Sequence, residues 1–269
     1  MNDSAIGIFD SGMGGLTVMR VLMARLPQER FVYLGDTARL PYGTKSAETV
    51  ERYSVQAAGA LVKRKIKLLV VACNTASGVA LPALRKAFAP LSVIDVIGPG
   101  ADAALAASPA GPIAVIATEG AVKAGAYVRA IHARAPNVEV MQEACPLFVP
   151  LAEEGLVEGA IAELIAHRYL DDVLARKPHA LVLGCTHYPV LKGVIGKIAG
   201  LDVALVDSAE TTAERVANTL RDAKQLRADR SPPEHRFLVT DAPERFARVG
   251  EVFLGRKIDP ASIELVDLQ

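Results

Sequence analysis

The sequence predicts an α/β fold of two similar doubly wound domains, each with a mostly parallel sheet and with the active site at their interface. Three observations favour this fold. Short apolar runs alternate with amphipathic segments along the chain. The succession of strand, small-residue turn and helix starts twice, at Ile6-Gly7-Ile8-Phe9 and at Ile113-Ala114-Val115-Ile116. In each copy a later strand ends in a cysteine, Cys73 in the first and Cys185 in the second.

The composition fits a globular α/β protein and argues against some partners. Of 269 residues, 51% are hydrophobic and 22% are charged. Lys and Arg total 30 and Asp and Glu total 30, so no net charge attracts nucleic acid or an anionic membrane. The amino terminus lacks the basic and apolar regions of a signal peptide, and no apolar run approaches the ~20 residues that span a bilayer. Three cysteines without scaffold spacing indicate a reducing compartment, so we expect a cytoplasmic protein.

In the first copy, the turn Asp10-Ser11-Gly12-Met13-Gly14-Gly15 joins a strand to a helix over residues 16–26. Its glycines permit close approach of a ligand to the backbone, and the helix amino terminus favours an anion. The spacing is neither that of a dinucleotide site nor that of a P-loop. Further strands are expected at 31–34, 68–72 and 93–96, with helices from the N-cap Ser46 to about 65 and from 74 to 88.

In the second copy, strands are expected at 113–117, near 138–140, at 180–184 and at 203–206, with helices through Tyr127 and from about 158 to 174. We interpret Ile97-Gly98-Pro99-Gly100 as a crossing between the halves. The tail, with helices at 213–223 and 243–253 and a strand at 237–240, most simply completes the first sheet. We therefore predict one domain of residues 1–97 plus 209–269 and a second of residues 98–208.

The two cysteines are the feature that most needs a functional explanation. Each follows the carboxyl end of a buried strand, where open parallel sheets place their ligand-handling groups. If the two halves close on each other, one thiol lies on each side of a small substrate. One thiolate then removes a proton while the opposite thiol returns one to the other face, which inverts a stereocentre.

Other uses of these cysteines remain open. A metal site would need three or four ligands, and Cys185-Thr186-His187 offers only two. Cys145 stands in apolar company and is interpreted as core. A hydrolase could pair Cys185 with His187, His167 or His179, although Cys73 would then be idle. A redox pair of Cys73 and Cys185 and a non-catalytic amino-acid-binding module are further alternatives.

The residues around the cysteines suit such proton transfer. A free thiol titrates near pH 8.5, so a thiolate at neutral pH needs a neighbouring group that favours it. Asp10 ends the first strand and His187 lies two residues after Cys185, and either can assist its thiol. The amides and hydroxyls of Asn74-Thr75 and Thr186-His187 are suited to bind a substrate carboxylate.

Several motifs together resemble the glutamate racemase family of the aspartate/glutamate racemase superfamily. The matching segments follow the family's order from residue 6 to about 190 and return near the end: Asp10–Gly15, Gly35-Asp36, Pro41–Gly43, Ala72–Ala76, Cys145–Pro150, Gly184–Pro189 and Asp241–Phe246. The resemblance implies a cofactor-independent and metal-free racemase that interconverts L- and D-glutamate and supplies D-glutamate for peptidoglycan, and hence for the cell wall and cell shape. It also implies a homodimer.

Residue by residue, the resemblance implies that Cys73 and Cys185 are the two acid/base thiols and that Asp10 and His187 tune them. It implies a further acid near His187, namely Glu153. The implied substrate contacts come from both halves and comprise Asp10, Ser11, Tyr42, Gly43, Asn74, Thr75, Thr118, Thr186 and His187.

The chain departs from the family pattern at two positions. Ala121 stands where the family usually has Thr, and Ala124 stands where Ser is common. Either change removes a hydroxyl from the second half, which affects local contacts and not the reaction. An aspartate racemase or a related diacid decarboxylase remains the alternative within the superfamily, because the length of the pocket is not readable from the sequence.

Overall fold

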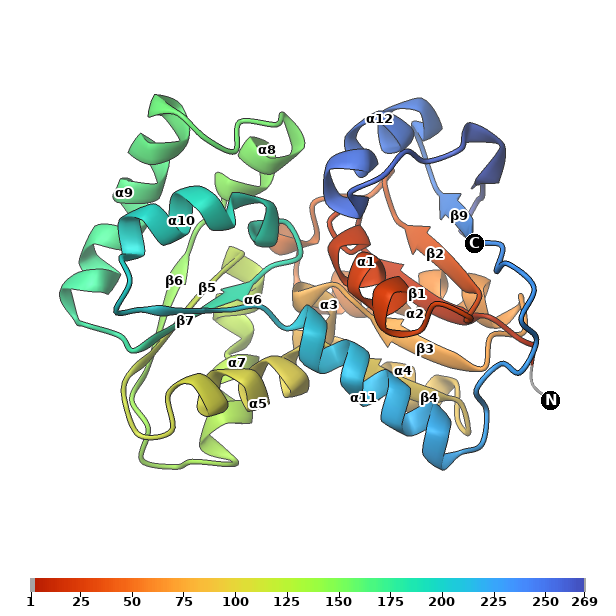
Figure 1. Cartoon of the computed structure of the whole chain (residues 1–269), viewed down its shortest axis with the longest axis horizontal. Helices are drawn as coiled ribbons and strands as arrows, with labels where there is room; N and C mark the ends of the chain where they lie inside the picture. The colour runs from red at the N-terminus through yellow and green to blue at the C-terminus, as the bar shows by residue number, and fades with distance from the viewer. Residues whose placement is uncertain (1–2, 269) are drawn as a thin grey trace.

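Two parallel β-sheets lie side by side in the computed structural model, which describes residues 3–268 (Figure 1). The first sheet has the order β10-β9-β2-β1-β3-β4 and the second has the order β6-β5-β7-β8. The first comprises β1 (Ile6–Asp10), β2 (Phe31–Gly35), β3 (Leu68–Val71), β4 (Ser92–Asp95), β9 (Arg236–Val239) and β10 (Ile263–Leu265). The second comprises β5 (Ile113–Ala117), β6 (Val140–Ala144), β7 (Ala180–Gly184) and β8 (Ala204–Val206). The chain therefore has a two-domain α/β fold.

The two sheets share one plan. The first four strands of each half pair in parallel in the same order, with the opening strand between the second and the third. This agreement supports the repeat seen in the sequence. Strands β1, β3, β5 and β7 are buried along their whole length, as expected where helices cover both faces of a parallel sheet.

Alternate residues of each central strand face opposite helical layers. In β1, Ile6 and Ile8 join one apolar cluster and Phe9 joins the other. The first sheet is covered on one face by α1 (Leu16–Arg25), α11 (Ala209–Asp222) and α12 (Pro243–Leu254). Its other face is covered by α2 (Ala47–Val62), α3 (Asn74–Val79) and α4 (Leu81–Ala87).

The second sheet is layered in the same way. One face packs against α5 (Ile97–Ala107) and α7 (Ala126–His132). The other packs against α8 (Phe148–Glu153), α9 (Ala160–Ala175) and α10 (Lys192–Ala199). Shorter elements connect these layers: α6 (Glu119–Ala124), η1 (Tyr42–Thr44), η2 (Tyr188–Leu191) and η3 (Pro260–Ser262).

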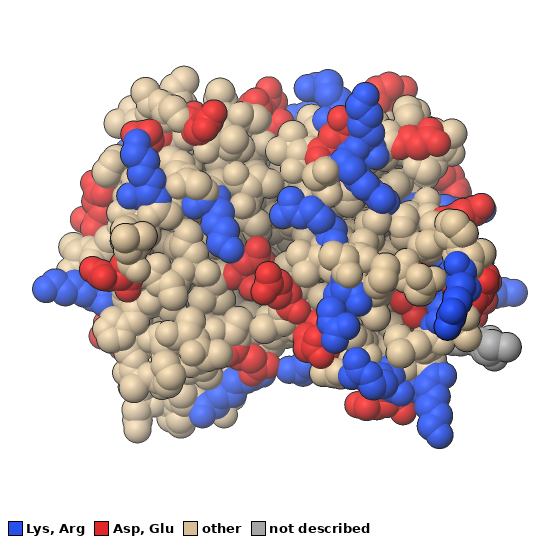
Figure 2. Space-filling view, in the orientation of Figure 1, with Lys and Arg blue, Asp and Glu red and all other residues tan. Residues whose placement is uncertain are grey.

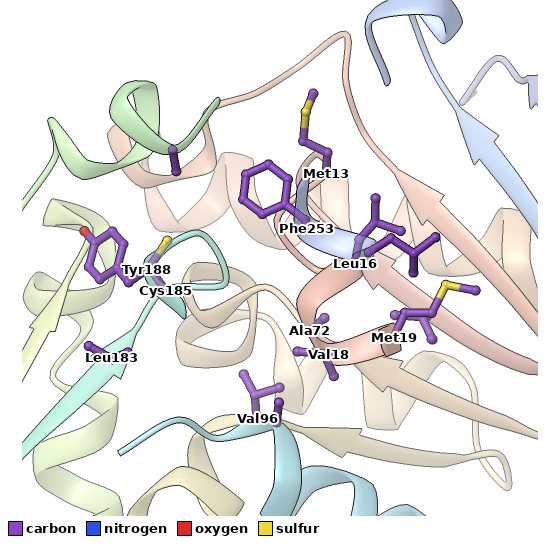
Figure 3. Close-up of a cluster of buried hydrophobic side chains, with 14 of the residues drawn as sticks. Met13, Leu16, Val18, Met19, Ala72, Val96, Leu183, Cys185, Tyr188 and Phe253 are labelled. Atoms are coloured by element: carbon purple, nitrogen blue, oxygen red, sulfur yellow. The ribbon is translucent and has the colours of Figure 1, made fainter. Parts of the chain in front are cut away.

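The apolar core continues from one lobe into the other. Figure 3 shows Met13 and Phe253 of the first lobe near Cys185 and Tyr188 of the second, within one cluster of buried side chains. Helix α11, which follows the last strand of the second sheet, packs against both α1 and α5 (Figure 1). The lobes therefore meet through packed side chains as well as through the chain crossings.

The surface carries interspersed charges. Figure 2 shows acidic and basic side chains mixed over the visible face. Within residues 3–268, none of the helices has both the length and the apolar character needed to cross a membrane.

Most expected elements are present, with shifted ends. The strand expected near 138–140 is β6, which begins at Val140 and carries Gln142 and Glu143 because it is the edge strand of its sheet. The segment Ile97–Gly100, interpreted from the sequence as a crossing between the halves, opens helix α5, with Asp95 Oδ1 accepting hydrogen bonds from the backbone of Ile97 and Gly98.

Three helices and one strand were not expected. Helices α5, α8 and α10 and strand β10 were not predicted from the sequence. Strand β10 extends the first sheet beyond β9, so the tail does complete that sheet. The chain passes from the first sheet to the second between Asp95 and Ile113, and it returns to the first sheet between Val206 and Arg236. The exact division at 97/98 and 208/209 remains our proposal.

Candidate active site

Both strand-end cysteines face one cavity between the lobes. Cys73 follows β3 and caps α3, where its sulfur accepts a 3.4 Å hydrogen bond from the backbone of Ala76. Cys185 follows β7 directly. The first lobe lines the cavity with Ser11, Gly12, Leu40, Pro41, Tyr42, Gly43, Cys73, Asn74 and Thr75, and the second with Thr118, Val149, Glu153, Cys185, Thr186 and His187.

Of the site residues predicted from the sequence, all but Asp10 line this cavity. Asp10 is fully buried beside it, at the end of β1. It accepts hydrogen bonds from the backbone of Gly12 at 3.0 Å and from Thr186 Oγ1 at 3.4 Å. Asp10 thus links the two lobes behind the cavity, and any direct contact with a ligand would need a rearrangement.

The cavity is small. Its volume is about 30 Å³, whereas one buried water needs ~10–15 Å³. Thr75 and Thr118 close one side, because their hydroxyl oxygens lie 2.9 Å apart across the lobe boundary. A ligand of amino-acid size therefore needs more room than the cavity has in this conformation.

The surroundings of Cys73 favour its neutral thiol. Its sulfur donates a hydrogen bond to Ser11 Oγ at 3.5 Å. Burial, and then the nearby Asp10 carboxylate, raise the pKa of Cys73 to about 12, although the bonds with Ser11 and Ala76 oppose this rise. Burial also raises the pKa of Asp10, against the lowering effect of His187. In this state Cys73 carries a proton to give.

Cys185 has a basic side chain, that of His187, as its neighbour. His187 Nδ1 lies 3.8 Å from Cys185 Sγ, and His187 Nε2 lies 3.1 Å from Glu153 Oε1. Burial alone would lower the pKa of His187, but the hydrogen bonds with Cys185 and Glu153 outweigh it and raise the value to about 10. An imidazolium beside a sulfur favours the thiolate over the thiol. The two sulfurs of one cavity thus have different neighbours, the Asp10 carboxylate near Cys73 and the His187 imidazole beside Cys185.

A carboxylate completes the chain of groups behind Cys185. Burial of Glu153 raises its pKa, but the hydrogen bond and charge of His187, with the charge of Arg245, outweigh this and leave the value lowered. Glu153 Oε2 lies 3.2 Å from an Arg245 nitrogen. Glu153 therefore remains ionised at neutral pH and stabilises the protonated His187.

Polar groups on both sides are placed to bind a ligand. Asn74 Oδ1 accepts a 2.9 Å hydrogen bond from the Tyr127 hydroxyl, which leaves the amide N–H groups of Asn74 as donors. The Tyr42 hydroxyl donates to Asp36 instead of pointing at the cavity. Tyr42 therefore offers its ring and its backbone to the cavity.

Two glycines allow the lobes to approach closely. A Cβ on Gly14 would lie 2.4 Å from His187 Nδ1, and a Cβ on Gly43 would lie 2.7 Å from the Thr118 Cβ. From the sequence, the glycines of the first turn were expected to let a ligand approach the backbone. Gly14 instead lets His187 of the other lobe approach.

The alternatives that the sequence left open find less support in this geometry. Of the three histidines considered for a hydrolase, only His187 lines the cavity, while His167 Nδ1 lies at the surface, 2.9 Å from Asp171 Oδ1. Cys145 is buried directly after β6, and its sulfur lies 3.8 Å from the backbone oxygen of Glu143 in that strand. All three cysteines are free thiols. Within residues 3–268 no cluster of three His, Cys, Asp or Glu residues is arranged to hold a metal.

Some residues that line or support the site were not predicted from the sequence. Gly12 and Pro41 belong to the matching motifs but received no role there, and Leu40 and Val149 also line the cavity. Arg245 stands in the last matching motif. Tyr127 gave no signal beyond its place in a helix.

Comparison with known proteins extends over nearly the whole chain. A sequence model of the Asp/Glu/hydantoin racemase family matches residues 14–216. Glutamate racemase of Geobacter metallireducens is 54% identical over 254 residues, which are 94% of each chain. Glutamate racemase of Neisseria meningitidis is 48% identical over 98% of this chain and 96% of its own. The crystal structure of glutamate racemase from Francisella tularensis in complex with D-glutamate superposes with a TM-score of 0.93, at 40% identity, over 100% of this chain and 99% of that one.

Proposed function

The chain belongs to the Asp/Glu/hydantoin racemase family, and we propose that it is a glutamate racemase in which the α-proton moves between the substrate and two thiols, those of Cys73 and Cys185. Glutamate racemase activity rests on relatives of 48–54% identity over almost their full length. One observation supports the mechanism: the sulfurs of Cys73 and Cys185 come from separate lobes and line one cavity. A carboxylate lies near the first sulfur and an imidazole beside the second.

The proposed reaction is a balanced exchange of protons. The Cys185 thiolate takes the α-proton from one face of glutamate, which leaves negative charge on the α-carbon and its carboxylate. The Cys73 thiol then delivers its own proton to the opposite face, so the product is the other enantiomer and the thiolate has moved to Cys73. In the reverse direction Cys73 is the base and Cys185 the acid, as microscopic reversibility requires.

The remaining groups of the site have distinct proposed roles. Protonated His187, supported by Glu153, stabilises the thiolate of Cys185. Asp10 tunes the protonation of the Cys73 thiol. Asn74, Thr75 and Thr186 bind the substrate: their N–H and O–H groups donate to its carboxylates, and their oxygens accept from its ammonium group. Ser11, Gly43, Tyr42 and Thr118 surround them. No pyridoxal phosphate or metal takes part in this scheme.

The biological setting belongs to the same proposal. D-Glutamate from this reaction would enter peptidoglycan and so serve the cell wall and cell shape. We expect a cytoplasmic enzyme that acts as a homodimer on a free amino acid, without nucleic-acid or membrane partners. The balanced charge of the chain is in keeping with this expectation.

Exchange of the α-proton in deuterated water tests the proposal. Chelator-treated protein without added pyridoxal phosphate is incubated in D₂O with L- or D-glutamate, and in parallel with L- or D-aspartate. The expected result is deuterium at the α-carbon together with loss of optical activity, for glutamate in preference to aspartate. Tight binding of glutamate without α-exchange would indicate a non-catalytic module, and a requirement for pyridoxal phosphate or metal would overturn the mechanism.

A further inference from the structure

We propose that Arg245 is a positioning residue of this site, which holds one oxygen of Glu153 so that the other faces His187. The proposal rests on the two-thiol racemisation described above and adds to it a residue from the last helix of the chain.

The contacts form a continuous chain from the surface to the sulfur. An Arg245 nitrogen lies 3.2 Å from Glu153 Oε2, and Glu153 Oε1 lies 3.1 Å from His187 Nε2. His187 Nδ1 in turn lies 3.8 Å from Cys185 Sγ. Each oxygen of Glu153 therefore has its own partner, and the carboxylate cannot rotate without losing one of them.

The burial of these groups shows which of them needs to be held. The side chains of His187 and Glu153 are 7% and 11% exposed, whereas that of Arg245 is 37% exposed. Glu153 is the last residue of the six-residue helix α8, so little regular structure fixes it from its own lobe. A mostly buried carboxylate loses solvation, and a second charge-assisted hydrogen bond compensates for that loss.

Helix α12 supports the same histidine a second time. Phe253, about two helical turns after Arg245, packs edge-on against the His187 ring with centroids 5.1 Å apart and planes at 74°. Arg245 lies on the first lobe and Glu153 on the second, and Figure 1 shows α12 and α8 facing each other across the boundary. The complete chain therefore exists only when the lobes are together.

An exposed ion pair by itself contributes little to stability. The contribution of Arg245 is therefore expected in the chemistry of Cys185 and not in the fold. Glu154 provides a matched control, because it also pairs with Arg245 at 3.2 Å but its side chain is 67% exposed and lies outside the cavity lining.

The test compares Arg245→Gln, Arg245→Lys and Glu154→Gln by steady-state racemisation. Arg245→Gln is expected to lower kcat/KM about tenfold, which corresponds to ~1.4 kcal/mol. Arg245→Lys retains the charge without the planar guanidinium and is expected to recover part of the loss. Glu154→Gln is expected to match the wild type. In Arg245→Gln the acidic limb of the pH profile should move to higher pH, because Glu153 loses a nearby positive charge.

Isotope effects separate positioning from general damage. Enantiomers have equal free energy, so kcat/KM must be the same in both directions, but the two α-deuterated enantiomers lose their deuteron to different thiols. In Arg245→Gln we expect the isotope effect to rise for the enantiomer deprotonated by Cys185 and not for the other. A wild-type kcat/KM, or equal changes in both isotope effects without a shift of the pH profile, would overturn the role of Arg245. Absence of α-exchange in the wild type would instead overturn the proposed function.

Discussion

The hydroxyl of Tyr127 donates a 2.9 Å hydrogen bond to the side-chain oxygen of Asn74. Tyr127 lies on α7 of the second lobe and Asn74 opens α3 of the first, directly after Cys73. Both side chains are buried. The bond fixes which end of the Asn74 amide faces the cavity, and it forms only when the lobes are together.

Replacing Tyr127 by Phe is therefore expected to weaken substrate binding. A lost buried hydrogen bond costs about 1 kcal/mol, so KM for glutamate should rise roughly fivefold with a smaller change in kcat. Tyr169→Phe is the control, because the Tyr169 hydroxyl binds only the exposed backbone N–H of Leu147. An unchanged KM in Tyr127→Phe would show that Asn74 does not depend on this bond.

The two cysteine variants test the mechanism directly. Cys73→Ala and Cys185→Ala each remove one proton carrier, and a positioned acid or base typically contributes 10²–10⁴-fold to the rate. We expect a loss of at least that range in racemisation, followed by circular dichroism, with the far-ultraviolet spectrum unchanged. Cys145→Ala, outside the cavity, should retain activity. Near-normal turnover in either of the first two variants would contradict the two-thiol assignment.

Gly14→Ala tests the close contact between the lobes. The added Cβ would lie 2.4 Å from His187 Nδ1 and 2.5 Å from Thr186 Oγ1, so the ring must shift or the lobes must separate. We expect kcat/KM to fall by at least about tenfold, a barrier increase of ~1.4 kcal/mol. Gly193→Ala on α10 is the matched control, because its Cβ would meet no atom within 4 Å. Equal activities in the two variants would argue against the contact.

A buried ion pair far from the cavity gives a prediction on stability. Lys67 Nζ lies 2.6 Å from Glu29 Oε2, and both side chains are almost fully buried. Lys67→Met removes the opposite charge from the buried Glu29 side chain, which is expected to lower the free energy of unfolding by about 3–5 kcal/mol. Urea denaturation measures the difference. Arg25→Gln, which breaks an exposed pair with Glu214, should cost less than ~1 kcal/mol.

The pH dependence of stability should report on His235. Burial, and then the charge of Arg256, lower its pKa to about 4. Between pH 6.5 and 4 the unfolded chain therefore binds more protons than the folded chain, so stability is complete above about pH 6.5 and falls as the pH drops towards 4. His235→Phe should remove this part of the acid sensitivity in thermal unfolding, whereas His167→Gln on the surface should keep it. Identical acid profiles for His235→Phe and the wild type would refute the assignment.

The repeated plan and the two cysteines were predictable because each rests on a local pattern. An apolar run followed by small polar residues specifies a strand that ends at a helix start, and this holds for Cys73, which caps α3. The N-cap role of Ser46 was predictable for the same reason, and its side chain accepts from Thr49. Thr118 directly follows strand β5, so its place in the cavity lining was also predictable from the end of a strand.

Other features depend on how distant segments meet, and no local pattern reports them. Helix α5 was missed because Gly98, Pro99 and Gly100 are poor helix formers, yet Pro is tolerated in a first turn and Asp95 supplies hydrogen bonds there. Tyr127 has the sequence context of an ordinary helix residue, and Arg245 was given no role although it stands in a matching motif. Their roles arise from the contact between two lobes, which the order of strands does not determine.

The packing of Phe253 against His187 has a consequence for biosynthesis. A nascent chain that has emerged only as far as β8 already holds both cysteines, His187 and Glu153, because these precede Val206 in the sequence. The aromatic ring that packs against the imidazole arrives only with α12, which follows all of these residues in the sequence. The enzyme should therefore gain its activity only after α12 has emerged from the ribosome, and chains stalled before α12 should fold in part without being active.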